Sequence, residues 1–156
     1  MELPHLNPQI MFPFFKEIIR VGALELNFLM DGKDTDGTLV QFEMVIPVGA
    51  KVPAPHYHVT VDETIYMLDG ILTQRVGDQI VELKPGDTCF IKRGVIHGFD
   101  NKHNQPARAL VTLSPASIGP DYFREVADVL NAGGPPDIQK ILSIMKNHGL
   151  EPVKPA

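Results

Sequence analysis

The chain has 156 residues, of which 44% are hydrophobic, enough for about one ordinary domain with a sizeable core. The formal net charge of -5 and the lack of any run of like charges argue against a binding surface for nucleic acid or an anionic membrane. We therefore expect a small-molecule partner or another protein, and neither nucleic acid nor a membrane.

The sequence also suggests a compartment. The first residues, MELPHLNPQI, contain no basic segment followed by an apolar run, and no later stretch is apolar and long enough to span a bilayer. The single cysteine, Cys89, permits no internal disulfide, which agrees with a reducing environment. We expect a soluble, cytoplasmic protein.

Residues 1–156 are expected to form one domain, beginning with an N-terminal arm over residues 1–23. The arm contains a short apolar stretch, MFPFFKEIIRVG, which is interrupted by Pro13. This stretch predicts either an edge strand or a short helix from Phe14 to Arg20. The arm should be followed by a β region over residues 24–115 and by two helices within residues 116–150.

The β region consists of short segments rich in Val, Ile, Thr and Phe, with turn residues between them. The predicted strands are LELNFLM, TLVQFEMVIP, TIYML, ILTQRV, QIVELK, TCFIK and RALVTLSP, joined by turns that include DGKDTDG, GD, PGD and RG. Seven or eight antiparallel strands without an intervening helix fit a sandwich, a jelly roll or a small barrel.

After Pro115 the hydrophobic period becomes helical. Two short helices are predicted, with Gly133 as the cap of the first and Gly149 as the stop of the second. Their expected apolar faces are Phe123, Val126, Ala127 and Leu130 in the first and Ile138, Ile141, Leu142 and Met145 in the second. Both are too short to be stable alone and must pack on the β region or on a second subunit. The last six residues, EPVKPA, are expected to form a loose tail.

The segment HYHVTVDE contains two histidines, His56 and His58, that would point to one face of a strand and could hold one metal ion. Glu63 follows at an odd spacing, so the chain must bend between Val59 and Asp62 if Glu63 is to join them. Alone, the pattern equally fits a polar strand face with Glu63 in solvent. Asp62 is an alternative to Glu63 as a ligand.

A second block, PGDTCFIKRGVIHGFDN, favours the metal site over the polar strand face. Together the two blocks resemble the paired motifs of the cupin superfamily. The first motif is matched by Gly49, His56, His58, Glu63 and Gly70, and the second by Gly86, Lys92, Gly94, His97 and Asn101. Lys92 stands where proline is usual, and Gly49 lies one residue further from His56 than is usual.

This resemblance implies a double-stranded β-helix, also called a jelly-roll barrel, with one metal ion held by His56, His58, Glu63 and His97. Three imidazoles and one carboxylate suit a divalent transition metal, namely Fe, Mn, Ni, Co or Zn, rather than calcium or magnesium. The affinity order does not choose among these metals. Open coordination positions would point to catalysis or to ligand capture.

The sequence leaves open which residues around the implied site face the interior of the barrel. On ILTQRV, one register turns Gln74 into the barrel as a substrate-binding group, and the other turns Arg75 inward. Apolar strand residues that would line the pocket are Phe42, Met44, Met67 and Phe99, although such residues are more often plain core. Cys89 is expected to be a buried small hydrophobe, and His103 an exposed loop histidine.

Three functions are compatible with these residues. The first is a metal-dependent dioxygenase of the quercetinase-like group acting on an aromatic or enolisable compound, with Glu63 as both ligand and catalytic base. The second is a sugar isomerase or epimerase, and the third is a non-catalytic metal- or ligand-binding cupin. A phosphorylated sugar should meet clustered Arg and Lys, but Arg75, Lys92, Arg93 and Arg108 are scattered along the sequence.

Small single-barrel cupins commonly pair. The segment MFPFFKEII and the two C-terminal helices offer apolar surface for an interface. We expect a homodimer, and the alternative is that these segments fold back on their own barrel and leave a monomer.

Overall fold

A computed structural model describes residues 15–51 and 54–154. The described strands are β1 (Glu17–Val21), β2 (Leu24–Met30), β3 (Val40–Ile46), β4 (His56–His58), β5 (Asp62–Asp69), β6 (Leu72–Val76), β7 (Gln79–Leu83), β8 (Thr88–Ile91), β9 (His97–Asp100), β10 (Ala107–Ser114) and β11 (Leu150–Pro152). The described helices are α1 (Pro120–Leu130) and α2 (Ile138–Asn147).

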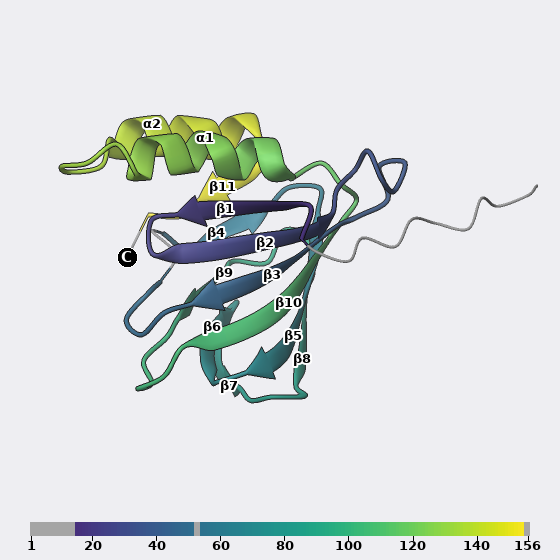
Figure 1. Cartoon of the computed structure of the whole chain (residues 1–156), viewed down its shortest axis with the longest axis vertical. Coiled ribbons are helices and arrows are strands. Elements are labelled where there is room, and N and C mark those ends of the chain that lie inside the picture. The colour runs from purple at the N-terminus through teal and green to yellow at the C-terminus, as the bar shows by residue number, and fades with distance from the viewer. Residues whose placement is uncertain (1–14, 52–53, 155–156) are drawn as a thin grey trace, which may run out of the picture.

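The strands form two antiparallel sheets that enclose an interior, with the two helices side by side across one end (Figure 1). One sheet has the order β1-β2-β3-β10-β5-β8, and the other has the order β11-β4-β9-β6-β7. The arrangement is the double-stranded β-helix of cupins with two short C-terminal helices, which confirms the predicted fold class.

Alternation of side chains along the central strands builds the core. On β3 and β10 every second residue is buried, which is the period that a strand with one face inside a barrel requires. The buried positions of these two strands are Val40, Phe42, Met44, Ile46, Ala107, Ala109, Val111 and Leu113. Each large apolar side chain buried in this way contributes about 1.5–3 kcal/mol, so the two strands form the stable backbone of the barrel.

Helix α1 is joined to the barrel by aromatic packing. The ring centroid of Phe123 lies 5.7 Å from that of Phe28 on β2 and 5.4 Å from that of Phe42 on β3. These separations are typical of favourable aromatic pairs. The predicted apolar face of α1 is therefore used against the chain's own barrel.

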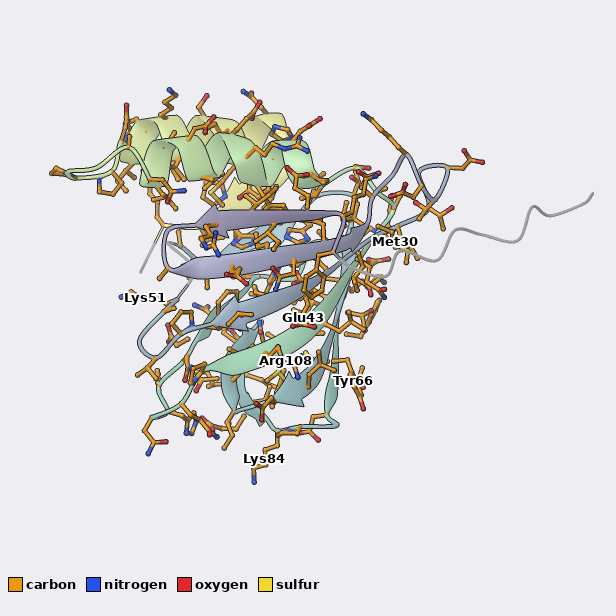
Figure 2. All side chains as sticks on the ribbon, viewed as in Figure 1. Met30, Glu43, Lys51, Tyr66, Lys84 and Arg108 are labelled. Carbon is orange, nitrogen blue, oxygen red and sulfur yellow. The ribbon has the colours of Figure 1, made fainter. Side chains whose placement is uncertain are left out.

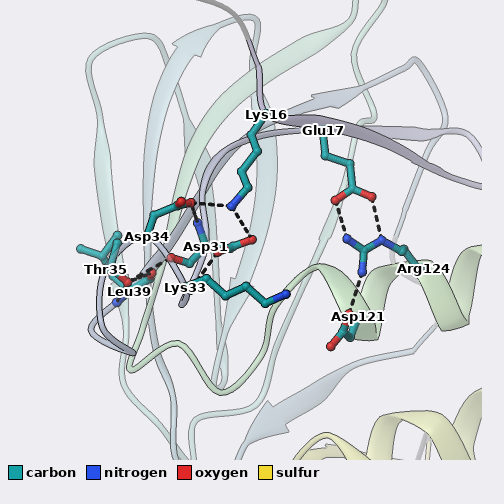
Figure 3. A network of polar contacts seen from close by, with 9 residues as sticks. All are labelled: Lys16, Glu17, Asp31, Lys33, Asp34, Thr35, Leu39, Asp121 and Arg124. Carbon is teal, nitrogen blue, oxygen red and sulfur yellow. Dashed lines mark hydrogen bonds and ion pairs between the residues drawn. The ribbon is translucent and has the colours of Figure 1, made fainter. Parts of the chain in front are cut away.

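Polar contacts fix the same helix at both of its ends. Arg124 donates to both carboxylate oxygens of Glu17 on β1, at 2.7 Å and 2.6 Å, and also to Asp121 at 2.6 Å (Figure 3). At the other end, the Asn131 side chain donates to the Arg20 carbonyl at 2.7 Å. Helix α1 ends at Leu130 and Asn131 is its cap, so the predicted cap at Gly133 was wrong.

Three further sequence expectations are decided by the structure. The segment that could be strand or helix contains strand β1, although its residues 11–14 lie outside the described part of the chain. Residues 151–152, expected in a loose tail, belong to strand β11, which pairs with β4. Ile138, expected on the buried face of α2, is 50% exposed at the start of that helix, and Ile144 is buried instead.

The apolar faces of both helices are buried within the chain, through Tyr122, Val126, Ala127, Ile141, Ile144 and Met145. The described part of the N-terminal segment keeps Phe15 and Ile18 exposed. No described helix is long and apolar enough to cross a membrane. The homodimer, the cytoplasmic location and the domain boundaries stay predictions.

Gly70, at the turn between β5 and β6, offers a test of the fold. Its φ is +71°, and a Cβ atom there would lie 2.4 Å from the Pro106 carbonyl oxygen and 2.7 Å from Ala107 Cα. We expect Gly70→Ala to lower the free energy of unfolding by about 3 kcal/mol. Alanine is strained in the left-handed conformation, and the backbone atoms of Pro106 and Ala107 must also move to make room for its Cβ atom. Chemical denaturation measures this.

Gly77 is the matched control, since its φ is +59° but nothing lies within 4 Å of the position of an added Cβ. Gly77→Ala should cost only about 1–2 kcal/mol, the penalty of the left-handed conformation. Equal losses in the two variants would contradict the close approach at Gly70.

Candidate metal centre

Three histidines from two neighbouring strands meet inside the barrel. His56 and His58 alternate along β4 and so share a face, and His97 at the start of β9 pairs directly with His56. The ring centroid of His97 lies 4.6 Å from that of His56 and 4.7 Å from that of His58. One nitrogen from each ring lies within 4.8 Å of the others, so the three imidazoles are placed as possible ligands of a single metal ion.

Glu63 reaches the same point from the other sheet. The chain bends at residues 59–60 before β5 begins, as the odd spacing requires. Oε2 of Glu63 lies 3.1 Å from Nε2 of His97 and 3.9 Å from Nε2 of His58. The four residues singled out in the sequence are therefore brought together.

Backbone carbonyls set the orientation of two of the rings. Nδ1 of His97 lies 3.0 Å from the Val95 carbonyl oxygen, and Nδ1 of His56 lies 3.1 Å from the Ala54 carbonyl oxygen. A carbonyl accepts only, so Nδ1 carries the proton in each ring and donates it. The lone pair of the neutral ring is then on Nε2, which is the usual arrangement around a ligating histidine.

This orientation leaves two acceptors in close contact. The Nε2 lone pair of His97 faces a carboxylate oxygen of Glu63 at 3.1 Å, and this buried nitrogen has no hydrogen-bond partner among the described residues. Such a contact is repulsive unless a cation, either a proton or a metal ion, lies between the two atoms. The donor set fits a divalent transition metal, with His56, His58 and His97 as possible ligands and Glu63 proposed as the fourth.

The acid-base properties agree with a site built for a cation. Burial, helped by the charge of His97, lowers the pKa of His56 to about 4, and burial also lowers the pKa of His58 to about 4. Burial acts to raise the pKa of Glu63, but the contact with His97 and the charges of the three imidazoles outweigh it and lower the pKa to about 2. Two rings are thus neutral and the carboxylate is ionised at neutral pH.

His97 behaves differently from the other two rings. Burial acts to lower its pKa, but the contact with Glu63 and the carboxylate charge are stronger and raise it. Of the three rings, His97 therefore keeps its added proton to the highest pH, and a metal ion must displace that proton where it is bound.

Asp62, the alternative ligand in the sequence, is directed away from the cluster and held by Arg93. Its Oδ1 accepts from Arg93 N at 2.8 Å and from Nε at 3.1 Å, and its Oδ2 accepts from the second guanidinium nitrogen at 3.0 Å. These hydrogen bonds lower the pKa of Asp62 to about 2. The next residue after Arg93, Gly94, donates its N–H to the His58 carbonyl at 2.8 Å. Asp62 and Arg93 thus join the strand of Glu63 to the loop before His97, a role that sequence spacing did not reveal.

Other residues singled out in the sequence lie outside the cluster. His103 contacts Glu82 at 2.6 Å, away from the metal centre. Cys89 is half-buried, and burial, with the nearby charge of Glu63, raises the pKa of its thiol. A raised thiol pKa gives no activated nucleophile. Asn101 is buried and donates to the carbonyls of Ile46 and Gln105 at 3.0 Å and 2.8 Å, which holds the end of β9.

The histidine cluster opens onto a largely apolar cavity of about 310 Å³. Its walls come from the barrel interior and from both helices, including Leu24, Leu26, Phe42, Met44, Phe99, Leu113, Phe123, Val126, Leu130, Ile141 and Met145. The charged groups on the described wall, apart from the histidines, are Glu63 and Lys51, which extends from the edge of the barrel (Figure 2). A ligand here would meet apolar surface over most of its body.

The register of β6 turns Gln74 into the cavity. Gln74 is completely buried and lines the wall, whereas Arg75 is exposed and bonded to the Gly77 carbonyl at 3.0 Å. Phe99, opposite Gln74 on β9, also lines the wall. Met67 was expected to line the pocket but is packed in the core and does not reach it.

A cluster of three histidines that could hold a metal ion, placed inside a double-stranded β-helix, defines a class of protein. Residues 42–113 match the cupin domain family. This part of the chain, a little under half of it, carries a cupin domain.

Relatives of known sequence are distant. The chain is 35% identical over 66 residues to the tetracenomycin polyketide synthase protein TcmJ of Streptomyces glaucescens, covering 42% of this chain and 44% of TcmJ. It is 30% identical over 98 residues to quercetin 2,3-dioxygenase of Bacillus subtilis, covering 62% of this chain and 28% of that enzyme. The match thus spans less than half the length of either relative.

Among solved structures, the fold is similar to that of a predicted oxalate decarboxylase from Thermotoga maritima. The TM-score is 0.56 at 21% identity, over 64% of this chain and 99% of that one. This likeness concerns the fold alone.

Metal loading should depend on pH. Imidazole binds a metal only when neutral, and the raised pKa of His97 makes it the first ring to take up a proton as the pH falls. We expect loading with Zn²⁺ to decline between about pH 8 and about pH 5, by up to about tenfold in apparent affinity for each pH unit below the His97 pKa. Equilibrium dialysis with elemental analysis measures it, and unchanged loading across this range would argue against histidine ligation.

The contact between Asp62 and Arg93 should tune the metal affinity. Because Asp62 precedes Glu63 and Arg93 lies in the loop before His97, Asp62→Asn should weaken Zn²⁺ binding by about tenfold, the usual effect of losing a group that orients ligands. Competition with a chromophoric chelator gives the affinity.

Glu43→Gln is the matched control. Glu43 pairs with Arg108 at 3.2 Å on the outer face of the six-stranded sheet, away from the ligands (Figure 2). It should leave the Zn²⁺ affinity unchanged. An equal loss in both variants would show a general effect of surface charge.

Proposed function

We propose that the protein is a metal-dependent dioxygenase acting on an aromatic or enolisable small molecule. The observation that carries this proposal is that the possible metal ligands and an apolar cavity adjoin each other. A buried cluster of three imidazoles and one carboxylate opens directly onto an apolar cavity of about 310 Å³. The similarity to a quercetin 2,3-dioxygenase supports it over the part of the chain that matches.

The cavity wall favours this substrate class over a sugar. A sugar carries hydroxyl groups on every side and needs many polar partners, whereas this wall is mostly apolar. Arg75, Arg93 and Arg108 lie outside the described wall, so a sugar phosphate would find no cluster of cations there. An enolisable or aromatic compound matches the wall better, because it needs polar contacts only at its oxygen atoms.

The residues of the site can take distinct roles. A divalent transition metal would supply Lewis acidity that makes a substrate enol or phenol hydroxyl more acidic. Glu63 is the only carboxylate on the described cavity wall, which supports it as the group that would accept the hydroxyl proton. Its pKa of about 2 makes it a weak base, so the transfer depends on an unusually acidic hydroxyl.

Apolar side chains provide the rest of the environment. Phe42 and Met44 form the barrel side of the cavity, and Phe123 and Met145 form the helix side. Together they would exclude water from a bound substrate, which strengthens every charge interaction at the histidine cluster.

Oxygen uptake tests the proposal. The protein should be loaded separately with Fe²⁺, Mn²⁺, Ni²⁺ and Co²⁺, and oxygen consumption followed with a panel of flavonols and simple diketones. With at least one metal and one substrate we expect turnover that falls by about 100-fold or more in His58→Ala, because a ligand is lost. Circular dichroism checks that this variant keeps its fold.

His103→Ala is the control, since His103 pairs with Glu82 outside the cluster, and it should retain full uptake. A metal-loaded protein that consumes no oxygen with any of these compounds would contradict the dioxygenase. It would favour a ligand-binding cupin.

A further inference from the structure

Gln74 is one of the polar residues on the described cavity wall that the metal centre does not use, together with Lys51 and Tyr122. It lies in the middle of β6, opposite Phe99 on β9, and its side chain is 0% exposed. His97 lies two residues before Phe99 on the same face of β9. Strand geometry therefore places the Gln74 and His97 side chains about 7 Å apart, measured between Cβ atoms.

Both hydrogens of the Gln74 amide are already engaged. Nε2 donates to the Gly98 carbonyl oxygen at 2.9 Å and to the Arg75 carbonyl oxygen at 3.1 Å. These acceptors are backbone atoms of β6 and β9 and cannot turn away. Rotating the amide by half a turn would direct Oε1 at two carbonyl oxygens, so the orientation is fixed.

The fixed amide leaves its oxygen free. Oε1 of Gln74 is buried and has no hydrogen-bond partner among the described residues. A buried acceptor without a partner is destabilising, because its desolvation is not compensated by a hydrogen bond. A ligand that supplied a donor at this point would recover that free energy, and a ligand with an oxygen acceptor there would be repelled.

We infer that Gln74 selects ligands that carry a hydroxyl or N–H donor about one ring away from the oxygen that faces the histidine cluster. The inference rests on the proposed function only in taking the cavity as the substrate site. It narrows the substrate class to molecules with an apolar body and two polar points. One is an acidic oxygen for the metal centre, and the other is a neutral donor for Gln74.

A matched ligand series tests this without turnover. The probes are three naphthalenes that share one hydroxyl. The first carries a second hydroxyl, the second lacks it, and the third carries a methoxy group in its place. Binding is measured by calorimetry on the Zn²⁺-loaded protein, because Zn²⁺ is redox-inert. We expect the dihydroxy compound to bind about 10- to 100-fold more tightly than either analogue.

Variants locate the effect. Gln74→Met keeps the side-chain volume but removes the acceptor, and should reduce the preference to about twofold or less. Gln74→Glu should keep it, since a buried glutamic acid is neutral, donates to one backbone carbonyl and still turns an oxygen to the cavity. Met44→Leu, on the apolar wall, is the control and should change the affinity for all three probes alike.

Several results would overturn the inference. The wild-type protein binding all three probes equally, or binding none of them, would do so even if Gln74→Met fails to fold. An unchanged preference in folded Gln74→Met would mean that another group selects the hydroxyl. Preference for the hydroxyl without oxygen uptake would refute only the dioxygenase, and uptake without preference would refute only the role of Gln74.

Discussion

The structure depends on one contact that is unfavourable without a cation, that of Glu63 Oε2 with His97 Nε2 at 3.1 Å. The two atoms come from different sheets, so the distance between them is set by how the sheets close around the interior. The Val95 carbonyl fixes the His97 ring by accepting from Nδ1, and the ring cannot turn its proton toward the carboxylate. The position between these two atoms therefore favours a proton or a metal ion, which no side chain of the barrel supplies.

Elements far from the cluster in sequence hold this arrangement. Strand β11 pairs with β4 over its whole length, placing Leu150 opposite His58 and Pro152 opposite His56. Just beyond β4, Val59 donates its N–H to the Gly149 carbonyl at 2.9 Å, at the bend that turns the chain toward Glu63. The C-terminal segment therefore supports the strand that carries two of the possible ligands.

The resemblance to the paired cupin motifs predicted the fold class and the group of converging residues, whereas strand geometry alone predicted only that His56 and His58 share a face. The sequence did not predict β11, whose three residues are too few to show a period and include a proline. It could not decide the direction of Gln74, because Leu72, Thr73 and Gln74 are all buried. Thr73, on the outward face, is covered by Glu82, to which it donates at 2.9 Å, so alternation carries no signal over these three residues.

The two ends of the cavity differ in whether they lie within the part of the chain that matches the cupin domain family. The histidine cluster, Glu63 and Gln74 lie within residues 42–113, the part that matches the cupin domain family. The helical wall lies outside that range, because Phe123 and Val126 come from α1 and Met145 comes from α2. A wall of this kind sets the shape of the apolar body that a substrate can have, while the cluster sets its chemistry. Similarity to relatives therefore bears on how the protein would react with a substrate, and the shape of that substrate has to be established from this chain's own helices.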